Sequence, residues 1–149
     1  MDTRENYMAQ ALALAREAGN CGEVPVGCVV VSPEGAVIGR GRNRREEDGD
    51  ASAHAEMLAI RGACAAAGSW RLSGCAIYVT LEPCPMCAGA IISARIPTVV
   101  YGAGDALTGS CGSVLNLFEE RFGHHPAVYG GVLADDCAAL LANFFRGLR

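Results

Sequence analysis

Two cysteines that are three residues apart constrain this chain most. They belong to a Pro-Cys-Pro-Met-Cys segment at 83–87, and a His-Ala-Glu segment at 54–56 precedes them by about thirty residues. Because proline suits the first turn of a helix, the two prolines predict a helix start. Residues at i and i+3 then lie on one side, and the helix N-terminus favours thiolates, the form of cysteine that binds zinc. The pair is therefore a candidate zinc-binding pair at a helix start.

His54 and Glu56 belong to the same site only under one condition. In mid-helix, residues at i and i+2 point to nearly opposite sides, but both can lean over the end of a helix that starts here. With Ser52 as the predicted N-cap, His54 lies in the first turn. His54, Cys84 and Cys87 then leave one position of a tetrahedral zinc open, which is typical of a catalytic site. A carboxylate beside the metal, Glu56, would be the general acid and base.

Three other functions are compatible with one Cys-x-x-Cys pair. A zinc ribbon needs a second such pair, and the sequence has none. A thioredoxin-like dithiol follows the first strand of its fold, whereas this pair follows the third predicted strand. A structural zinc module used for binding would have four protein ligands, and Glu56 beside an open coordination position argues against it.

Helical and strand patterns alternate along the 149 residues, which predicts a single layered α/β domain covering residues 1–149. The β-branched run Val26–Val31 is typical of a strand buried on both faces. Further strands are predicted at 37–42, 76–81, 98–101 and, more weakly, 127–132. Helices are predicted at about 4–18 (capped by Thr3 and ended by Gly19), 53–67, 86–94, 113–120 and 134–146, with a polar loop at 43–52 and a glycine-rich loop at 102–112.

Composition limits the partners. The net charge of −4 argues against a general nucleic-acid binder. All twelve basic residues are arginine, however, and four of them lie within 40–45, where they form either an RNA-binding surface or a solvated loop offset by the acids at 46–48. The polar N-terminus is unlike a signal peptide, and no apolar run approaches the roughly 20 residues of a membrane span. We therefore expect a soluble, cytoplasmic protein with reduced thiols.

With these residues placed, the chain resembles the cytidine/deoxycytidylate deaminase superfamily and, within it, the bacterial tRNA-specific adenosine deaminases. A His-x-Glu followed by Pro-Cys-x-x-Cys is a known signature of zinc nucleobase deaminases. The segment Thr80–Ala90 and the Phe-Phe-Arg at 144–146 are more specific to the tRNA enzymes. The resemblance covers nearly the whole chain and includes Glu-Val-Pro-Val-Gly at 23–27, Asp105 with Gly109, and Gly-Val-Leu at 131–133.

The resemblance implies a three-layer αβα sandwich around a five-stranded mixed sheet. It also implies a homodimer with one zinc ion per subunit and with tRNA near the subunit boundary. The implied reaction converts the wobble adenosine of an arginine tRNA anticodon to inosine. The nearest alternative is a deaminase of a free base or nucleoside such as guanine or cytosine, which the zinc site alone does not distinguish; the arginines at 40–45 and the Phe-Phe-Arg segment favour RNA.

The resemblance also assigns roles to nine residues. It makes His54, Cys84 and Cys87 zinc ligands, Glu56 the proton shuttle, Asn43 an amide that reads the base, Val26 an apolar pocket wall, Asp105 a contact to the anticodon loop, and Phe145 and Arg146 part of a C-terminal helix on the RNA. By itself Asn43 is also an ordinary loop residue, and core packing would explain one of Phe144 and Phe145. The two histidines at 124 and 125 are interpreted as part of a loop.

The chain departs from the family pattern at three places that concern RNA affinity and leave the zinc site intact. Leu107 stands where a lysine is expected, Gly123 replaces a common asparagine, and the chain ends at Arg149 without a basic tail.

Overall fold

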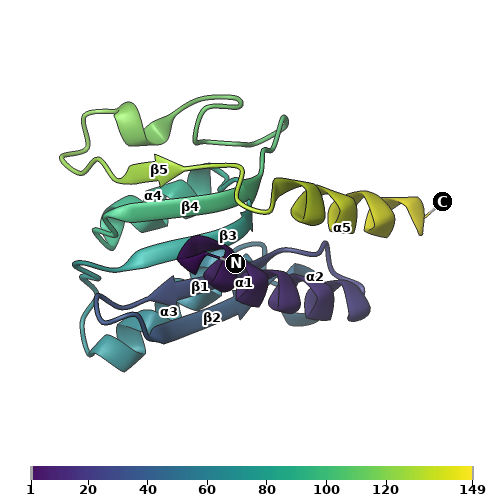
Figure 1. Ribbon diagram of the computed structural model, residues 1–149, viewed down its shortest axis with the longest axis horizontal. Helices are drawn as coiled ribbons and strands as arrows, with labels where there is room; N and C mark the ends of the chain where they lie inside the picture. Colours follow the sequence, from purple (N-terminus) through teal and green to yellow (C-terminus); the bar gives the residue numbers. More distant parts are fainter. Residues whose placement is uncertain (1, 149) are drawn as a thin grey trace.

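The computed structural model describes residues 2–148. Its centre is a five-stranded sheet with the strand order β2-β1-β3-β4-β5 (Figure 1). Strand β1 pairs antiparallel with β2 and β3, whereas β4 pairs parallel with β3 and β5. The sheet is therefore mixed, as expected. The strands are β1 Gly27–Val31, β2 Val37–Arg42, β3 Ala76–Leu81, β4 Thr98–Ala103 and β5 Ala127–Tyr129.

Helices cover both faces of this sheet and complete the expected three-layer αβα sandwich (Figure 1). Helices α1 and α5 lie on one face, and α3 and α4 lie on the other. The short α2 follows β2, and a 3-10 turn, η1, precedes β5. The bounds are α1 Thr3–Asn20, α2 Arg45–Asp48, α3 Ala55–Ala67, α4 Pro85–Ser93, η1 Leu117–Glu119 and α5 Ala134–Arg146.

The central strand β1 is buried at every residue, as its β-branched run predicts. Because side chains alternate along a strand, Cys28 and Val30 pack on the α3–α4 side, while Val29 and Val31 pack on the α1–α5 side. Strand β2 instead brings glycine to α3: a Cβ built on Gly39 would lie 2.1 Å from a backbone oxygen of this helix. This close approach holds α3 against the sheet, with its first turn beside the pocket described below.

Several element ends differ from the sequence prediction. Asp2, not Thr3, caps α1, because its carboxylate accepts the N–H of Glu5 at 2.8 Å and completes a capping box. This helix continues through Gly19 to Asn20. Strand β4 extends past 101 to Ala103, and α2 lies within the loop predicted for 43–52.

The two weakest predictions are only partly confirmed in the segment before α5. The helix predicted for 113–120 is reduced to the three residues of η1, which the side chain of Asn116 caps. Strand β5 ends at Tyr129 instead of 132, because Gly130 packs directly on the ring of Tyr101 and Gly131 has a φ of +88°. The predicted loop at His124 and His125 is confirmed.

Within residues 2–148, no helix combines the length and the apolar character needed to cross a bilayer. The eight cysteines are all free thiols.

Candidate active site

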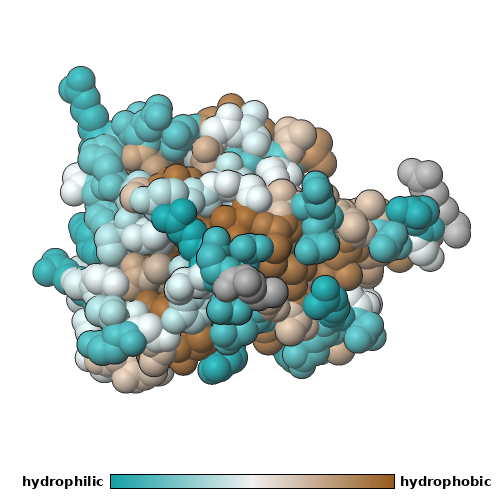
Figure 2. Space-filling view, in the orientation of Figure 1, coloured by the Kyte–Doolittle hydropathy of each residue, from teal (hydrophilic) through white to brown (hydrophobic). Residues whose placement is uncertain are grey.

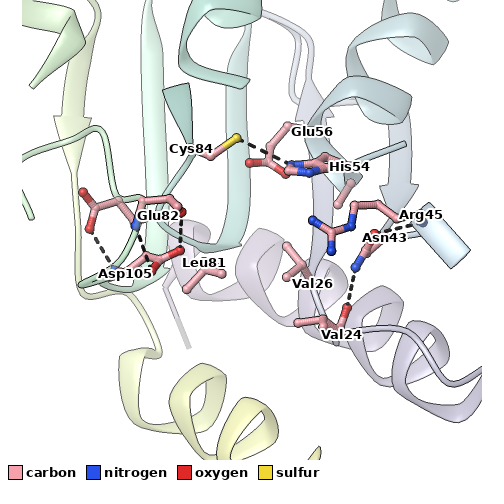
Figure 3. Close-up of a pocket in the computed structure, with 12 residues that line it drawn as sticks. Val24, Val26, Asn43, Arg45, His54, Glu56, Leu81, Glu82, Cys84 and Asp105 are labelled. Carbon is pink, nitrogen blue, oxygen red and sulfur yellow. Dashed lines mark hydrogen bonds between the residues drawn. The ribbon is translucent and has the colours of Figure 1, made fainter. Parts of the chain in front are cut away.

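Two helix N-termini meet at one pocket. Helix α3 begins beside β2, and α4 begins directly after β3, on the same face of the sheet. Their first residues and the loops after β2 and β4 form a pocket with twelve lining residues (Figure 3). The pocket encloses about 150 Å³. Six of the nine predicted site residues line it: Val26, Asn43, His54, Glu56, Cys84 and Asp105.

Three potential metal ligands come together at this place. The Nδ1 atom of His54 lies 3.6 Å from Cys84 Sγ and 3.5 Å from Cys87 Sγ. All three donor atoms lie within 4.8 Å of one another. Cys84 is the N-cap of α4, and Cys87 lies in the first turn of that helix. The predicted helix start behind the Cys-x-x-Cys pair is thus confirmed.

The residue that caps α3 differs from the predicted one. Ser52 does not cap the helix, because its hydroxyl donates to the carboxylate of Asp50 at 2.7 Å. His54 itself is the N-cap and makes no side-chain capping bond. Its ring is therefore available to lean over the helix end toward the two sulfurs.

The protonation of the cluster suits a zinc ion. A hydrogen bond from the Cys87 thiol lowers the pKa of Cys84 to about 4, and His54 adds to this effect. The same hydrogen bond raises the pKa of Cys87, and the neighbouring Cys84 also raises the pKa of His54. The protein thus already holds one thiolate beside an imidazole and a second sulfur at a helix N-terminus. This N, S, S donor set with one coordination position left is that of an open zinc site.

Glu56 is the second residue of α3 and lies beside the cluster (Figure 3). Only 4% of its surface is exposed. Because burial disfavours the charged form, the pKa of this carboxyl is raised to about 7. A carboxyl with this pKa both accepts and releases protons near neutral pH.

Asn43 and Val26 form the wall on the β1–β2 side. The Asn43 side chain donates to the carbonyl oxygen of Val24 at 3.2 Å and accepts from the N–H of Arg45 at 3.1 Å. An amide carries two N–H donors and two acceptor sites, so one of each remains for a ligand. Val26 adds an apolar surface and is 9% exposed.

Asp105 lines the opposite wall, in the loop after β4. Its carboxylate accepts hydrogen bonds from the N–H groups of Leu107 at 3.0 Å and Thr108 at 3.3 Å, and from the Thr108 hydroxyl at 2.8 Å. The carboxylate therefore closes a turn of its own loop at the edge of the pocket. Leu107, at the position where a lysine was expected, is 87% exposed.

Glu82 is a pocket residue that sequence reasoning missed. It is 2% exposed and accepts backbone N–H groups from Asp105, Cys111 and Ser113 and the hydroxyl of Ser113. Burial would raise the pKa of this carboxyl, but these hydrogen bonds outweigh burial and hold it below its ordinary value. An acid between a buried strand and Pro83 is the sequence signal that could have identified it.

Phe145 and Arg146 are not brought to this pocket. They lie at the end of α5, which projects beyond the body of the molecule (Figure 1). Phe145 is 49% exposed and packs edge-on against Phe144 with ring centroids 5.5 Å apart. The space-filling view shows hydrophobic residues gathered where the first part of α5 meets the body of the molecule (Figure 2). The assigned contact of these two residues with RNA stays a prediction.

The arginines at 40–45 are partly neutralised. Arg42 forms ion pairs with Glu17 and Glu47, and Arg44 pairs with Glu47 and Asp48. These pairs match the solvated loop offset by acids that the sequence allowed. Arg45 differs, because it lines the pocket.

Comparison with known proteins gives one consistent family. Residues 1–103 match the family model of the cytidine and deoxycytidylate deaminase zinc-binding region. The tRNA-specific adenosine deaminase of Bacillus subtilis is 49% identical over 150 aligned residues, which cover 100% of this chain and 92% of that protein.

Solved structures agree with this similarity. A structure of a tRNA:A34 deaminase, which edits A to I at the wobble position of transfer RNA, superposes with a TM-score of 0.87 at 47% identity and covers 91% of this chain and 99% of the other. A guanine deaminase from Nitrosomonas europaea has a TM-score of 0.83 at 26% identity, over 94% of this chain and 83% of the other.

Proposed function

This chain belongs to the cytidine and deoxycytidylate deaminase family, and from this premise we propose that it is a hydrolytic deaminase that converts adenosine in tRNA to inosine. The observation that carries the proposal is the position of Glu56. Its buried carboxylate lies beside the His54, Cys84 and Cys87 cluster, within a pocket, in a chain 49% identical to a tRNA-specific adenosine deaminase.

Zinc is the cofactor of this family, and His54, Cys84 and Cys87 are the residues that would hold it. When bound, zinc lowers the pKa of water to about 7 and so supplies a nucleophile at neutral pH. Glu56 accepts the proton of the attacking water on its carboxylate. It passes this proton to the ring nitrogen next to the attacked carbon of adenine. A further proton transfer to the exocyclic amine releases ammonia and leaves inosine.

The remaining pocket residues orient the base. Asn43 has one amide N–H and one acceptor site free for the edge of a purine, and Val26 offers an apolar surface for its ring. We expect a pocket of about 150 Å³ to admit one base at a time. A polynucleotide substrate must therefore insert a single unstacked nucleotide, which a loop permits at low cost.

We further propose that the substrate is the wobble adenosine of an anticodon stem-loop, and that the protein acts as a homodimer in the cytoplasm with one zinc ion per subunit. In support, Met86 at the start of α4 and Val114 and Leu115 in the loop after β4 are large apolar residues with 38%, 52% and 42% of their surface exposed. A second copy covering them would remove this apolar surface from water. Sedimentation equilibrium of the zinc-loaded protein tests the dimer; a monomer at micromolar concentration would contradict it.

Incubation of the zinc-loaded protein with three substrates tests the main proposal. An anticodon stem-loop with adenosine at the wobble position should yield inosine, and the same RNA with that adenosine moved into the stem should not. Free guanine and free cytosine should release no ammonia. Ammonia from guanine, without inosine in the RNA, would favour a free-base deaminase instead.

A further inference from the structure

The four arginines at 40–45 do not share one environment. Gly39 and Gly41 of β2 face α3, so the alternating Arg40 and Arg42 point to the opposite face of the sheet. Arg42 forms ion pairs on that side with Glu17 and Glu47. Most of these arginines therefore point away from the pocket or are neutralised by acids. The number of arginines at 40–45 overstates the positive charge that a substrate in the pocket would meet.

Arg45 is the exception. It forms no ion pair with any residue in 2–148 and is exposed. Figure 3 shows its side chain reaching from the start of α2 toward the other pocket residues, with His54 on one side and Asn43 on the other. Among the twelve lining residues, all within the described part of the chain, it is the only arginine, and lysine is absent from the sequence.

The backbone of Arg45 is fixed even though its side chain is exposed. Its N–H donates to the side-chain oxygen of Asn43 at 3.1 Å. The next two N–H groups, of Glu46 and Glu47, donate to the buried carboxylate of Glu23 at 3.1 and 2.7 Å. The guanidinium is thus anchored to the same segment as the amide proposed to contact the base.

The two walls of the pocket also differ in charge. The acids Asp105 and Glu82 lie on the wall opposite Arg45, as Figure 3 shows. A phosphate entering along the Asp105 wall would be repelled, whereas one entering along the α2 side would meet a planar donor suited to phosphate oxygens. An uncharged free base has no group that requires this guanidinium.

We propose that Arg45 binds a backbone phosphate next to the inserted nucleotide, and that it thereby selects a nucleotide within RNA over a free base. The inference rests on the proposed function, because it presumes that a nucleotide enters this pocket. It assigns the α2 side of the entrance to the phosphate chain and the Asp105 side to uncharged donor groups of the RNA.

Binding measured against salt concentration tests this role. The probe is a fluorescent anticodon stem-loop carrying inosine at the target position, so that no turnover occurs. For Arg45→Ala we expect the dissociation constant to rise about tenfold. The slope of log affinity against log salt should become shallower by about 0.7, the value for one single-strand phosphate contact. Arg45→Lys should retain most of the slope.

Arg40→Ala is the matched control, because it removes the same charge from an exposed arginine that points away from the pocket. It should keep both the affinity, within about twofold, and the wild-type slope. A second probe replaces one phosphate beside the target with a neutral methylphosphonate. At one such position the wild-type protein should lose affinity while Arg45→Ala loses none.

The outcomes separate this inference from the proposed function. If Arg45→Ala keeps the wild-type slope, or if Arg40→Ala loses as much, Arg45 does not bind phosphate even though the protein deaminates RNA. A wild-type protein that neither binds the stem-loop nor forms inosine in it would overturn both.

Discussion

The carboxylate of Glu82 accepts the backbone N–H of Asp105 at 3.0 Å, which joins the end of β3 to the loop that forms one wall of the pocket. The same carboxylate accepts two further N–H groups of this loop, from Cys111 and Ser113. A Cβ built on Gly109 would lie 2.5 Å from its carboxyl group, so the loop also packs directly on it. A single buried acid thus fixes the wall opposite Arg45.

Glu82→Gln should weaken this wall. The amide nitrogen would face N–H donors and leave at least one of them unsatisfied, which costs about 1–3 kcal/mol of unfolding free energy. Urea unfolding measures this loss, and steady-state kinetics should show a higher KM from the displaced loop. Glu34→Gln, at an exposed turn, is the control and should change neither. Unchanged stability and KM in Glu82→Gln would show that Glu82 does not hold this loop in place.

The same residue predicts a pH dependence. Because hydrogen bonds hold the folded pKa of Glu82 below its ordinary value of 4.5, the folded state binds this proton less readily than the unfolded chain. The stabilisation from Glu82 is therefore complete above pH 4.5 and is lost as the pH falls through the lower folded value. Urea unfolding at several pH values should show the gap between wild type and Glu82→Gln narrowing below pH 4.5. A gap that widens there would contradict this assignment.

Much of this fold follows from local sequence patterns. The strands at 37–42 and 76–81 and the helix at 134–146 have the predicted bounds. Their periodicity is strong and is flanked by turn residues. Within 104–126 the predicted loops are confirmed, but the helix predicted for 113–120 is reduced to the three residues of η1. The N–H groups of Cys111 and Ser113, just before it, donate to Glu82 more than twenty residues upstream, a contact that local patterns do not reveal.

The candidate site shows the same division. The spacing of Cys84 and Cys87 and the need for His54 and Glu56 to share a helix start led to their cluster. Ser52 was wrong as the cap, since its hydroxyl turns to Asp50. Arg45 differs from its neighbours because Arg42 and Arg44 form ion pairs and Arg45 does not. Which arginines are paired depends on tertiary contacts and could not be read from the sequence.

Replacement of Glu56 by Gln should leave the zinc content near one ion per chain and lower the deamination rate by about 10²–10⁴-fold. Glutamine keeps the shape of the buried side chain but carries no proton between atoms. Elemental analysis and inosine formation on the same sample measure the two effects. Glu46→Gln, exposed on α2, serves as the control and should retain the normal rate. A normal rate for Glu56→Gln would exclude the proton-transfer role.

Cys87→Ala should lose metal and stability together. Cys87 is fully buried and supplies one of the three clustered donors, so its loss removes a ligand that supports the folded state. Metal analysis should find well below one zinc ion per chain, and the melting temperature should no longer respond to a chelator. Cys64→Ala, a thiol outside the cluster, should retain both metal and chelator response. Full zinc occupancy in Cys87→Ala would argue against ligation.

The contact between β2 and α3 gives the last prediction. An alanine at Gly39 would place its Cβ 2.1 Å from the carbonyl oxygen of Ala59, so helix and strand must separate at a cost of about 1–3 kcal/mol. Gly62→Ala, on the helix side of the same interface, makes only ordinary contacts, with the Cα of Gly39 at 3.6 Å and the N of Arg40 at 4.0 Å, and should gain about 0.5–1 kcal/mol from helix propensity. Thermal unfolding should therefore shift in opposite directions for the two variants. Because α3 positions Glu56, Gly39→Ala should also lose deaminase activity, whereas Gly62→Ala should keep it. Equal melting temperatures for the two variants would show that this close approach does not hold the helix in place.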